Sequence, residues 1–132
     1  MTTPDNAPAR VTVEIKRRRR EDPVHFIVRL ANEHDEPVDL YLRGRDITFD
    51  VIVARAKGPI VWQRLQGQVI QAILRLETLG PLEAIELEGE WNLRDNKGRH
   101  VGYGSYEMKA VVLTDDTMSL ESPPVLLDVD ER

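Results

Sequence analysis

A run of seventeen residues, 90–106, concentrates the side chains that could do chemistry. It reads EWNLRDNKGRHVGYGSY and contains three glycines, a tryptophan, two tyrosines and an Asp-Asn pair. Closely spaced glycines can cradle a phosphate, clustered carboxylate and amide oxygens can bind calcium, and a serine in a tight turn can be a nucleophile. Each of these sites requires a particular neighbouring pattern, and the run can be compared with each in turn.

The glycine spacing does not fit a phosphate site. Gly98, Gly102 and Gly104 form Gly-x-x-x-Gly-x-Gly, which is neither the dinucleotide fingerprint nor a P-loop. Both motifs also need a helix N-terminus after the loop, whereas the alternation that follows here predicts a strand. The stretch Asp95–Gly98 has one carboxylate where a calcium loop needs several oxygen ligands. It fits a hairpin turn better, with Asp95 accepting a hydrogen bond from the backbone two residues on and Gly98 at positive φ.

No catalytic or metal-binding set emerges from the remaining residues. Ser105 lies in Gly-Tyr-Gly-Ser-Tyr, which is not the Gly-x-Ser-x-Gly nucleophile elbow. His25, His34 and His100 show no ligand spacing to one another, and the chain has no cysteine. We therefore assign no catalytic, cofactor-binding or metal-binding residue and no cofactor, and we expect a protein that is not an enzyme.

Composition predicts a cytoplasmic protein whose partner is neither nucleic acid nor membrane. The 132 residues suit one domain, and the absence of cysteine fits a reducing compartment. The N-terminus has no apolar signal region, and no apolar run approaches the roughly 20 residues needed to span a bilayer. The net charge of -5 disfavours a phosphate-backbone partner.

One basic run, residues 16–20 with the sequence KRRRR, stands against this acidic background. A patch for nucleic acid or an acidic partner is one interpretation. We favour a solvated connection between two strands, because Glu21 and Asp22 follow at once and no aromatic residue is interleaved to stack on a base.

Apolar residues alternate with polar ones along most of the chain. In residues 85–91 the glutamates at 86, 88 and 90 share one face of an extended chain, whereas a helix would scatter them around its circumference. Similar alternation occupies residues 11–15, 26–30, 38–42, 49–53 and 106–112, with turn signals between the runs. The pattern predicts an all-β fold of seven or eight short strands, arranged as a sandwich or a barrel, with a loose tail at residues 1–9 and a single domain over 10–129.

Residues 68–79 are ambiguous between helix and strand. Apolar side chains at 69, 70, 73, 74 and 76 suit either period. We favour a short turn or helical start that leads into a strand at 72–79.

With the turn interpretation in place, the chain resembles a known family, the bacterial intracellular proteinase inhibitor domain called BsuPI. The resemblance covers residues 24–113, and its most specific part is the block from Trp91 to Tyr106. Leu82 stands where the family usually has glycine, and Asn92 replaces an aspartate. The matching positions, in order, are Gly44, Phe49-Asp50-Val51, Gly58, Val61-Trp62, Gly67, Gln71-Ala72, Pro81, Glu83, Trp91, Asp95, Gly98, Val101, Gly104 and Tyr106.

The resemblance implies an all-β, immunoglobulin-like antiparallel β-sandwich of seven to nine strands that inhibits an intracellular subtilisin-like serine protease. In such a fold Trp62 and Trp91 would centre the core, and Tyr106 would bond nearby backbone as a tyrosine corner. A rigid surface with loops held by a stiff scaffold suits inhibition.

Exposure alone nominates partner-contact residues on two turns, and the oligomeric state is left open. An arginine or lysine from the first turn would suit a trypsin-like enzyme better than a subtilisin-like one. The alternative function is a non-inhibitory protein-protein interaction module that pairs through an exposed edge strand, residues 11–16 or 125–129. The candidate contact residues are Arg55, Lys57, Arg94, Asn96, Lys97, Arg99 and His100.

Overall fold

The structure, a computed structural model, describes residues 8–44, 46–115 and 120–130. These residues form ten strands and no helix, one strand more than the upper expectation because β9 has only two residues. The expected tail falls mostly outside the described residues, and Ala9 at its end is buried. The strands are β1 Arg10–Lys16, β2 Val24–Ala31, β3 Val38–Arg43, β4 Phe49–Arg55, β5 Ile60–Gln63, β6 Leu74–Leu79, β7 Ala84–Trp91, β8 Gly104–Val112, β9 Leu120–Glu121 and β10 Val125–Val129.

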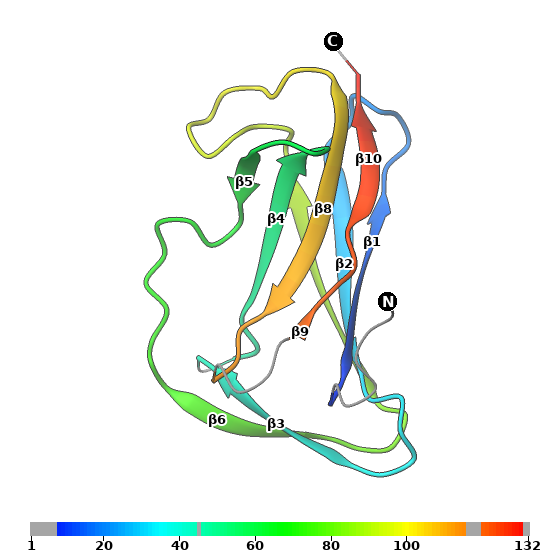
Figure 1. The fold of residues 1–132 in the computed structure, drawn as a ribbon, viewed down its shortest axis with the longest axis vertical. Coiled ribbons are helices and arrows are strands. Elements are labelled where there is room, and N and C mark those ends of the chain that lie inside the picture. Colours follow the sequence, from blue (N-terminus) through cyan, green and yellow to red (C-terminus); the bar gives the residue numbers. More distant parts are fainter. Residues whose placement is uncertain (1–7, 45, 116–119, 131–132) are drawn as a thin grey trace.

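The strands build an antiparallel sandwich, as the family resemblance implied (Figure 1). One sheet has the order β1-β2-β7, and the other has the order β10-β8-β4-β5, with β9 also pairing with β8. A separate ribbon of β3 and β6 lies across one end of the sandwich. Leu40, Leu42 and Leu79 of this ribbon are fully buried, so it closes that end of the core.

Strand β7 shows how the sequence pattern sorts side chains between core and solvent. Glu86, Glu88 and Glu90 are exposed, as predicted, while Trp91 is fully buried. Gly89 lies opposite Phe26 on β2, and a Cβ atom at residue 89 would stand 2.6 Å from two atoms of that ring. The glycine therefore makes room for the phenylalanine, which is why this strand tolerates a residue with no side chain to pack.

Aromatic side chains form a continuous row through the core. Ring centroids are 6.5 Å apart for Phe26 and Trp62, 6.1 Å for Trp62 and Trp91, and 6.0 Å for Trp91 and Tyr106. These separations lie in the favourable range for aromatic pairs. Trp91 is at the centre, as expected, but Trp62 is only partly buried and packs at the margin of the core.

For residues 68–79 we expected a short turn or helical start that leads into a strand; the strand is present, but no helix precedes it. Residues 64–67 form a turn, residues 68–73 are extended without regular pairing, and β6 begins at Leu74 rather than at residue 72. The apolar pattern misled because Val69, Ile73, Leu74 and Leu76 are exposed, so their spacing does not record a buried face. Residues 74–79 form strand β6 because they pair with β3 in antiparallel register.

The basic run lies in the connection between β1 and β2, as favoured, but its arginines turn back onto β10. The Arg17 guanidinium donates to the carbonyl of Asp128. Arg20 pairs with Asp128 at 3.7 Å and with Asp130 at 4.0 Å. Partial burial lowers the pKa of Arg17, an effect that Asp128 opposes. Part of the positive charge of this run is thus neutralised by intramolecular ion pairs.

Candidate protein-contact surface

The two predicted contact turns lie at the same end of the sandwich. One is the β4–β5 turn, residues 56–59, with Arg55 at the end of β4, and the other is the β7–β8 loop, residues 92–103. The amide of Ala56 donates to the carbonyl of Ser105 at 3.1 Å, which ties the first turn to the beginning of β8. Figure 1 shows the β7–β8 loop in yellow beside β5. Residues that are about forty positions apart in sequence therefore form one surface.

Asp95 organises the tip of the β7–β8 loop. Its Oδ1 accepts hydrogen bonds from the amides of Lys97 and Arg99, each at 2.9 Å, and Gly98 takes φ +84°. The predicted turn is therefore present. The Arg99 backbone amide and then the Lys97 amide hold the pKa of the Asp95 carboxyl below its usual range, with a further contribution from the Arg99 side chain at 3.4 Å.

The base of the loop is anchored in the core. The indole N–H of Trp91 donates to the carbonyl of Arg94 at 2.9 Å. Leu93 is 2% exposed although its φ is +65°, a conformation that side chains other than glycine rarely adopt. Its carbonyl accepts from the amide of Val101, which is also buried. The burial of two apolar side chains thus holds a backbone conformation that a free chain would avoid.

Tyr106 forms the expected corner. Its hydroxyl donates to the carbonyl of Gly102 at 2.5 Å, and burial raises its pKa. The Arg55 guanidinium lies over the tyrosine ring, 5.2 Å from the centroid, in a cation–π arrangement. A Cβ atom at Gly102 would stand 3.0 Å from an Arg55 nitrogen, so the arginine packs directly on this backbone. Arg55 therefore serves mainly to join the two turns.

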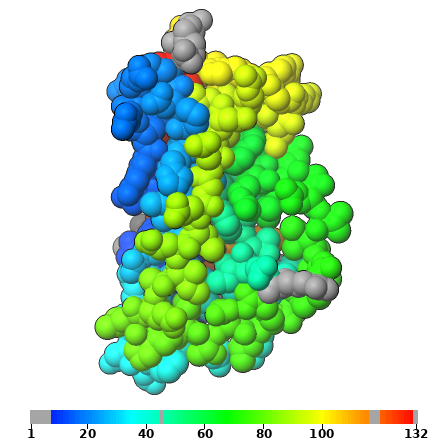
Figure 2. Space-filling model, turned by 180° about the vertical axis from the view of Figure 1, so that it is seen from behind, coloured from blue at the N-terminus to red at the C-terminus, as the bar shows by residue number. Residues whose placement is uncertain are grey.

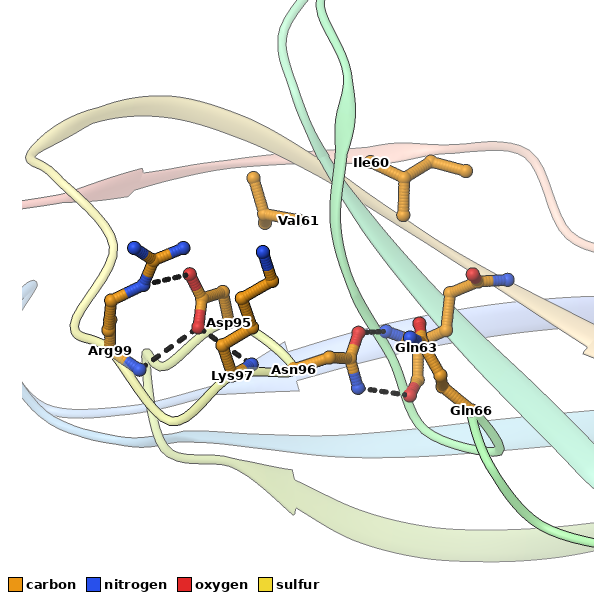
Figure 3. A pocket seen from close by; sticks show the side chains of 8 residues that line it. All are labelled: Ile60, Val61, Gln63, Gln66, Asp95, Asn96, Lys97 and Arg99. Atoms are coloured by element: carbon orange, nitrogen blue, oxygen red, sulfur yellow. Dashed lines mark hydrogen bonds and ion pairs between the residues drawn. The ribbon is translucent and has the colours of Figure 1, made fainter.

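Asn96 also has an internal role. Its Oδ1 accepts from the amide of Gln63 at 2.8 Å, and its Nδ2 donates to the carbonyl of the same residue at 3.0 Å (Figure 3). Strand β5 is at the edge of its sheet, so the asparagine side chain supplies the backbone partner that a further strand would provide. This pair of bonds fastens the loop to β5.

The other predicted contact residues differ in how freely their side chains project. Arg94 donates to the carbonyl of Gly98 at 2.9 Å, and His100 Nδ1 lies 2.5 Å from the carbonyl of Val101. Lys57, Lys97 and Arg99 are exposed, and Lys57 takes φ +60° at the end of its turn. The projecting charges of this surface are therefore mostly positive.

An open hollow of about 360 Å³ separates the loop from β5. Ile60 and Val61 line it from the strand, Gln66 from the following turn, and Asp95 and Lys97 from the loop, as Figure 3 shows. Within the described residues, no group of three or more histidine, aspartate or glutamate side chains is arranged to hold a metal ion. The described residues also contain no helix long and apolar enough to cross a membrane.

The sequence did not lead us to include the connection between β5 and β6 in the candidate contact surface. The turn at residues 64–67 and the extended residues 68–73 lie along the same margin as the loop, on the left in Figure 1 and in green on the right in Figure 2. A signal was available, because Phe49-Asp50, Gly67 and Gln71-Ala72 all belong to the family pattern. Asp50 among them holds the turn at residues 64–67, since its Oδ1 accepts from the amide of Leu65 at 3.0 Å.

The fold and this surface define an immunoglobulin-like β-sandwich that presents a self-supported set of loops at one margin. A family model described as "Intracellular proteinase inhibitor", BsuPI, matches residues 11–117. The chain belongs to this intracellular proteinase inhibitor family, as the resemblance indicated.

Comparison with other proteins adds two distant structures. A Bordetella pertussis protein provisionally described as ApaA is 13% identical, with 96% of this chain and 98% of that chain covered and a TM-score of 0.44. An X-ray structure of a structural genomics target is also 13% identical, covering 96% and 90% with a TM-score of 0.40. A search of curated proteins found no match.

Proposed function

We propose that this protein is a cytoplasmic, reversible inhibitor of a subtilisin-like serine proteinase and does no catalysis of its own. The observation that carries the proposal is the family match over residues 11–117. The partner is then a protein, neither nucleic acid nor membrane, and no cofactor takes part.

The geometry of the loops supports inhibition. Binding costs less free energy when the contact loops are already ordered in the free protein. Here Asp95, Asn96, Trp91 and Tyr106 hold the β7–β8 loop, and the bond from Ala56 to Ser105 holds the neighbouring turn. Such a surface can cover an active site without first paying to become ordered, and a typical inhibitor interface of about 800 Å² per partner fits on one margin of this sandwich.

Titration against proteinases of different specificity tests the proposal. The purified protein is added to subtilisin-type, chymotrypsin-type and trypsin-type enzymes while hydrolysis of a peptide substrate is followed. We expect inhibition of the subtilisin-type enzyme at micromolar inhibitor or below. No inhibition at a micromolar excess, with degradation of the protein itself, would show that the proposal is wrong.

The alternative function, an interaction module that uses an exposed edge strand, has one observation in its favour. Strand β10 is the edge of its sheet, and Leu126 on it is 68% exposed. A partner that adds a strand there would lose binding with Leu126→Asp, whereas proteinase inhibition through the loop margin would be unchanged.

A further inference from the structure

The connection between β5 and β6 presents an unusual length of exposed, extended, apolar chain. Val69 is 94% exposed, Ile73 is 44% exposed, and Leu74 at the start of β6 is 52% exposed. Ile70, between the first two, is half-buried and faces the protein. Six residues of extended chain, 68–73, span roughly 20 Å. Exposed apolar side chains gathered in this way mark an interaction site more often than a plain surface.

The backbone of this segment has hydrogen-bonding capacity to offer. Within the described residues, the amide and carbonyl groups of Val69, Ile70 and Ala72 make no hydrogen bond. An extended chain with open backbone groups can pair with another strand, and main-chain hydrogen bonds then give affinity while pockets for alternate side chains give specificity. The partner that such a segment suits is a groove that binds polypeptide in extended form.

Both ends of the segment are held by the sandwich. At the first end, the Arg64 guanidinium donates to the carbonyl of Phe49 at 2.7 Å and lies 4.0 Å from that ring's centroid. Asp50 bonds the amide of Leu65, and the amide of Gln68 donates to Leu65 at 3.0 Å. At the other end, the amide of Gly44 donates to the carbonyl of Ile73 at 2.7 Å. Residues 68–73 are thus fixed at both ends, so ordering this segment on binding costs little conformational entropy.

We propose that residues 68–73 occupy the substrate groove of the target proteinase as an added β-strand, with Val69 in an apolar side-chain pocket. This inference rests on the proposed function. A proteinase groove binds its substrate as an extended chain. The backbone groups of the groove would form hydrogen bonds with the amide and carbonyl groups of Val69, Ile70 and Ala72. The β7–β8 loop on the same margin places Lys97 and Arg99 against the groove's rim, which favours an enzyme with an acidic rim and apolar specificity.

A charge placed on the segment tests the side-chain contact. Val69→Asp in the full-length protein should weaken inhibition of a subtilisin-type proteinase by about 30-fold or more, as expected for loss of a central contact. Leu82→Asp is the matched control, because Leu82 is also an exposed apolar residue, at 72%, and lies in the turn before β7. Its inhibition constant should stay within about threefold of wild type.

A second pair of variants tests the backbone contact. Ala72→Pro removes an amide hydrogen from the extended segment, whereas Ala72→Ser keeps it. We expect inhibition to weaken by about tenfold with proline and to change little with serine. Thermal unfolding of each variant shows that the sandwich is intact, since residues 69 and 72 make no core contact.

The outcomes separate the two proposals. Wild-type protein that inhibits no proteinase overturns both the function and the segment assignment. Wild-type protein that inhibits, together with undiminished inhibition by either Val69→Asp or Ala72→Pro, overturns the segment assignment and leaves the function standing. Loss of inhibition in Lys97→Glu with Arg99→Glu but not in Val69→Asp would assign the contact to the β7–β8 loop alone.

Discussion

Replacing Asn96 by alanine should loosen the attachment of the β7–β8 loop to β5 while leaving the sandwich folded. One bond to the strand is kept, because the Asn96 backbone amide still donates to the carbonyl of Val61 at 3.3 Å. The change removes two hydrogen bonds to Gln63, of 2.8 and 3.0 Å. Both are exposed to solvent, so each contributes near the lower end of about 0.5–1.5 kcal/mol. The free energy of unfolding should therefore fall by about 1 kcal/mol, and the melting temperature by about 3–4 °C.

Hydrogen exchange at the Gln63 amide measures this contact directly. In the wild-type protein that amide donates to Asn96, so exchange requires the loop to open. With alanine at position 96 the amide has no acceptor, and we expect its exchange to be faster by at least about tenfold. Lys97→Ala is the control, because Lys97 is the neighbouring residue and the Gln63 amide donates to the Asn96 side chain, not to Lys97. Unchanged exchange at Gln63, with stability equal to wild type, would refute the fastening role of Asn96.

Three further predictions concern the corner, the core and the loop. Tyr106→Phe leaves the Gly102 carbonyl without its 2.5 Å donor, and chemical denaturation should show a loss of about 1–1.5 kcal/mol; no loss would contradict the corner. Gly89→Ala forces a Cβ against the Phe26 ring and should lower the free energy of unfolding by about 1–3 kcal/mol. In a Phe26→Leu background the same substitution should cost at least about 1 kcal/mol less. Additive effects in this double-mutant cycle would contradict the contact. The pKa of Asp95 is lowered from 3.8 in the folded protein, so its carboxylate stabilises the loop fully above that pH. This stabilisation is lost as the pH falls through the pKa that Asp95 has in the folded protein. Tryptophan fluorescence should report the resulting acid transition, and the transition should be absent in Asp95→Asn.

Local pattern was enough to predict the all-β fold and its best-defined turn, while the choice of a sandwich over a barrel came from the family resemblance. The alternation at Glu86, Glu88 and Glu90 places these side chains in solvent in any sheet, because successive side chains of a strand point to opposite faces. Asp95 and Gly98 form their turn through contacts within five residues, which the residue types alone indicate. Leu82, where the family pattern has glycine, does take positive φ, +61°.

The contact surface was only partly predictable. Exposure on turns nominated Asn96 and Arg55, yet the structure engages both internally, the first with β5 and the second with the Tyr106 ring. The exposed residues 68–73 were expected to form a short turn or helical start, because exposed apolar residues give the same sequence pattern as buried ones.

The sequence by itself determined which residues extend, where the chain turns and which faces are apolar, since these follow from backbone sterics and side-chain type over a few positions. Only the tertiary structure decided which turns meet and which polar groups are already satisfied. Asn96 reaches Gln63 across 33 positions, and Arg17 reaches Asp128 across 111. Such contacts depend on how the two sheets pack, and packing is a property of the whole chain that no local window of residues contains.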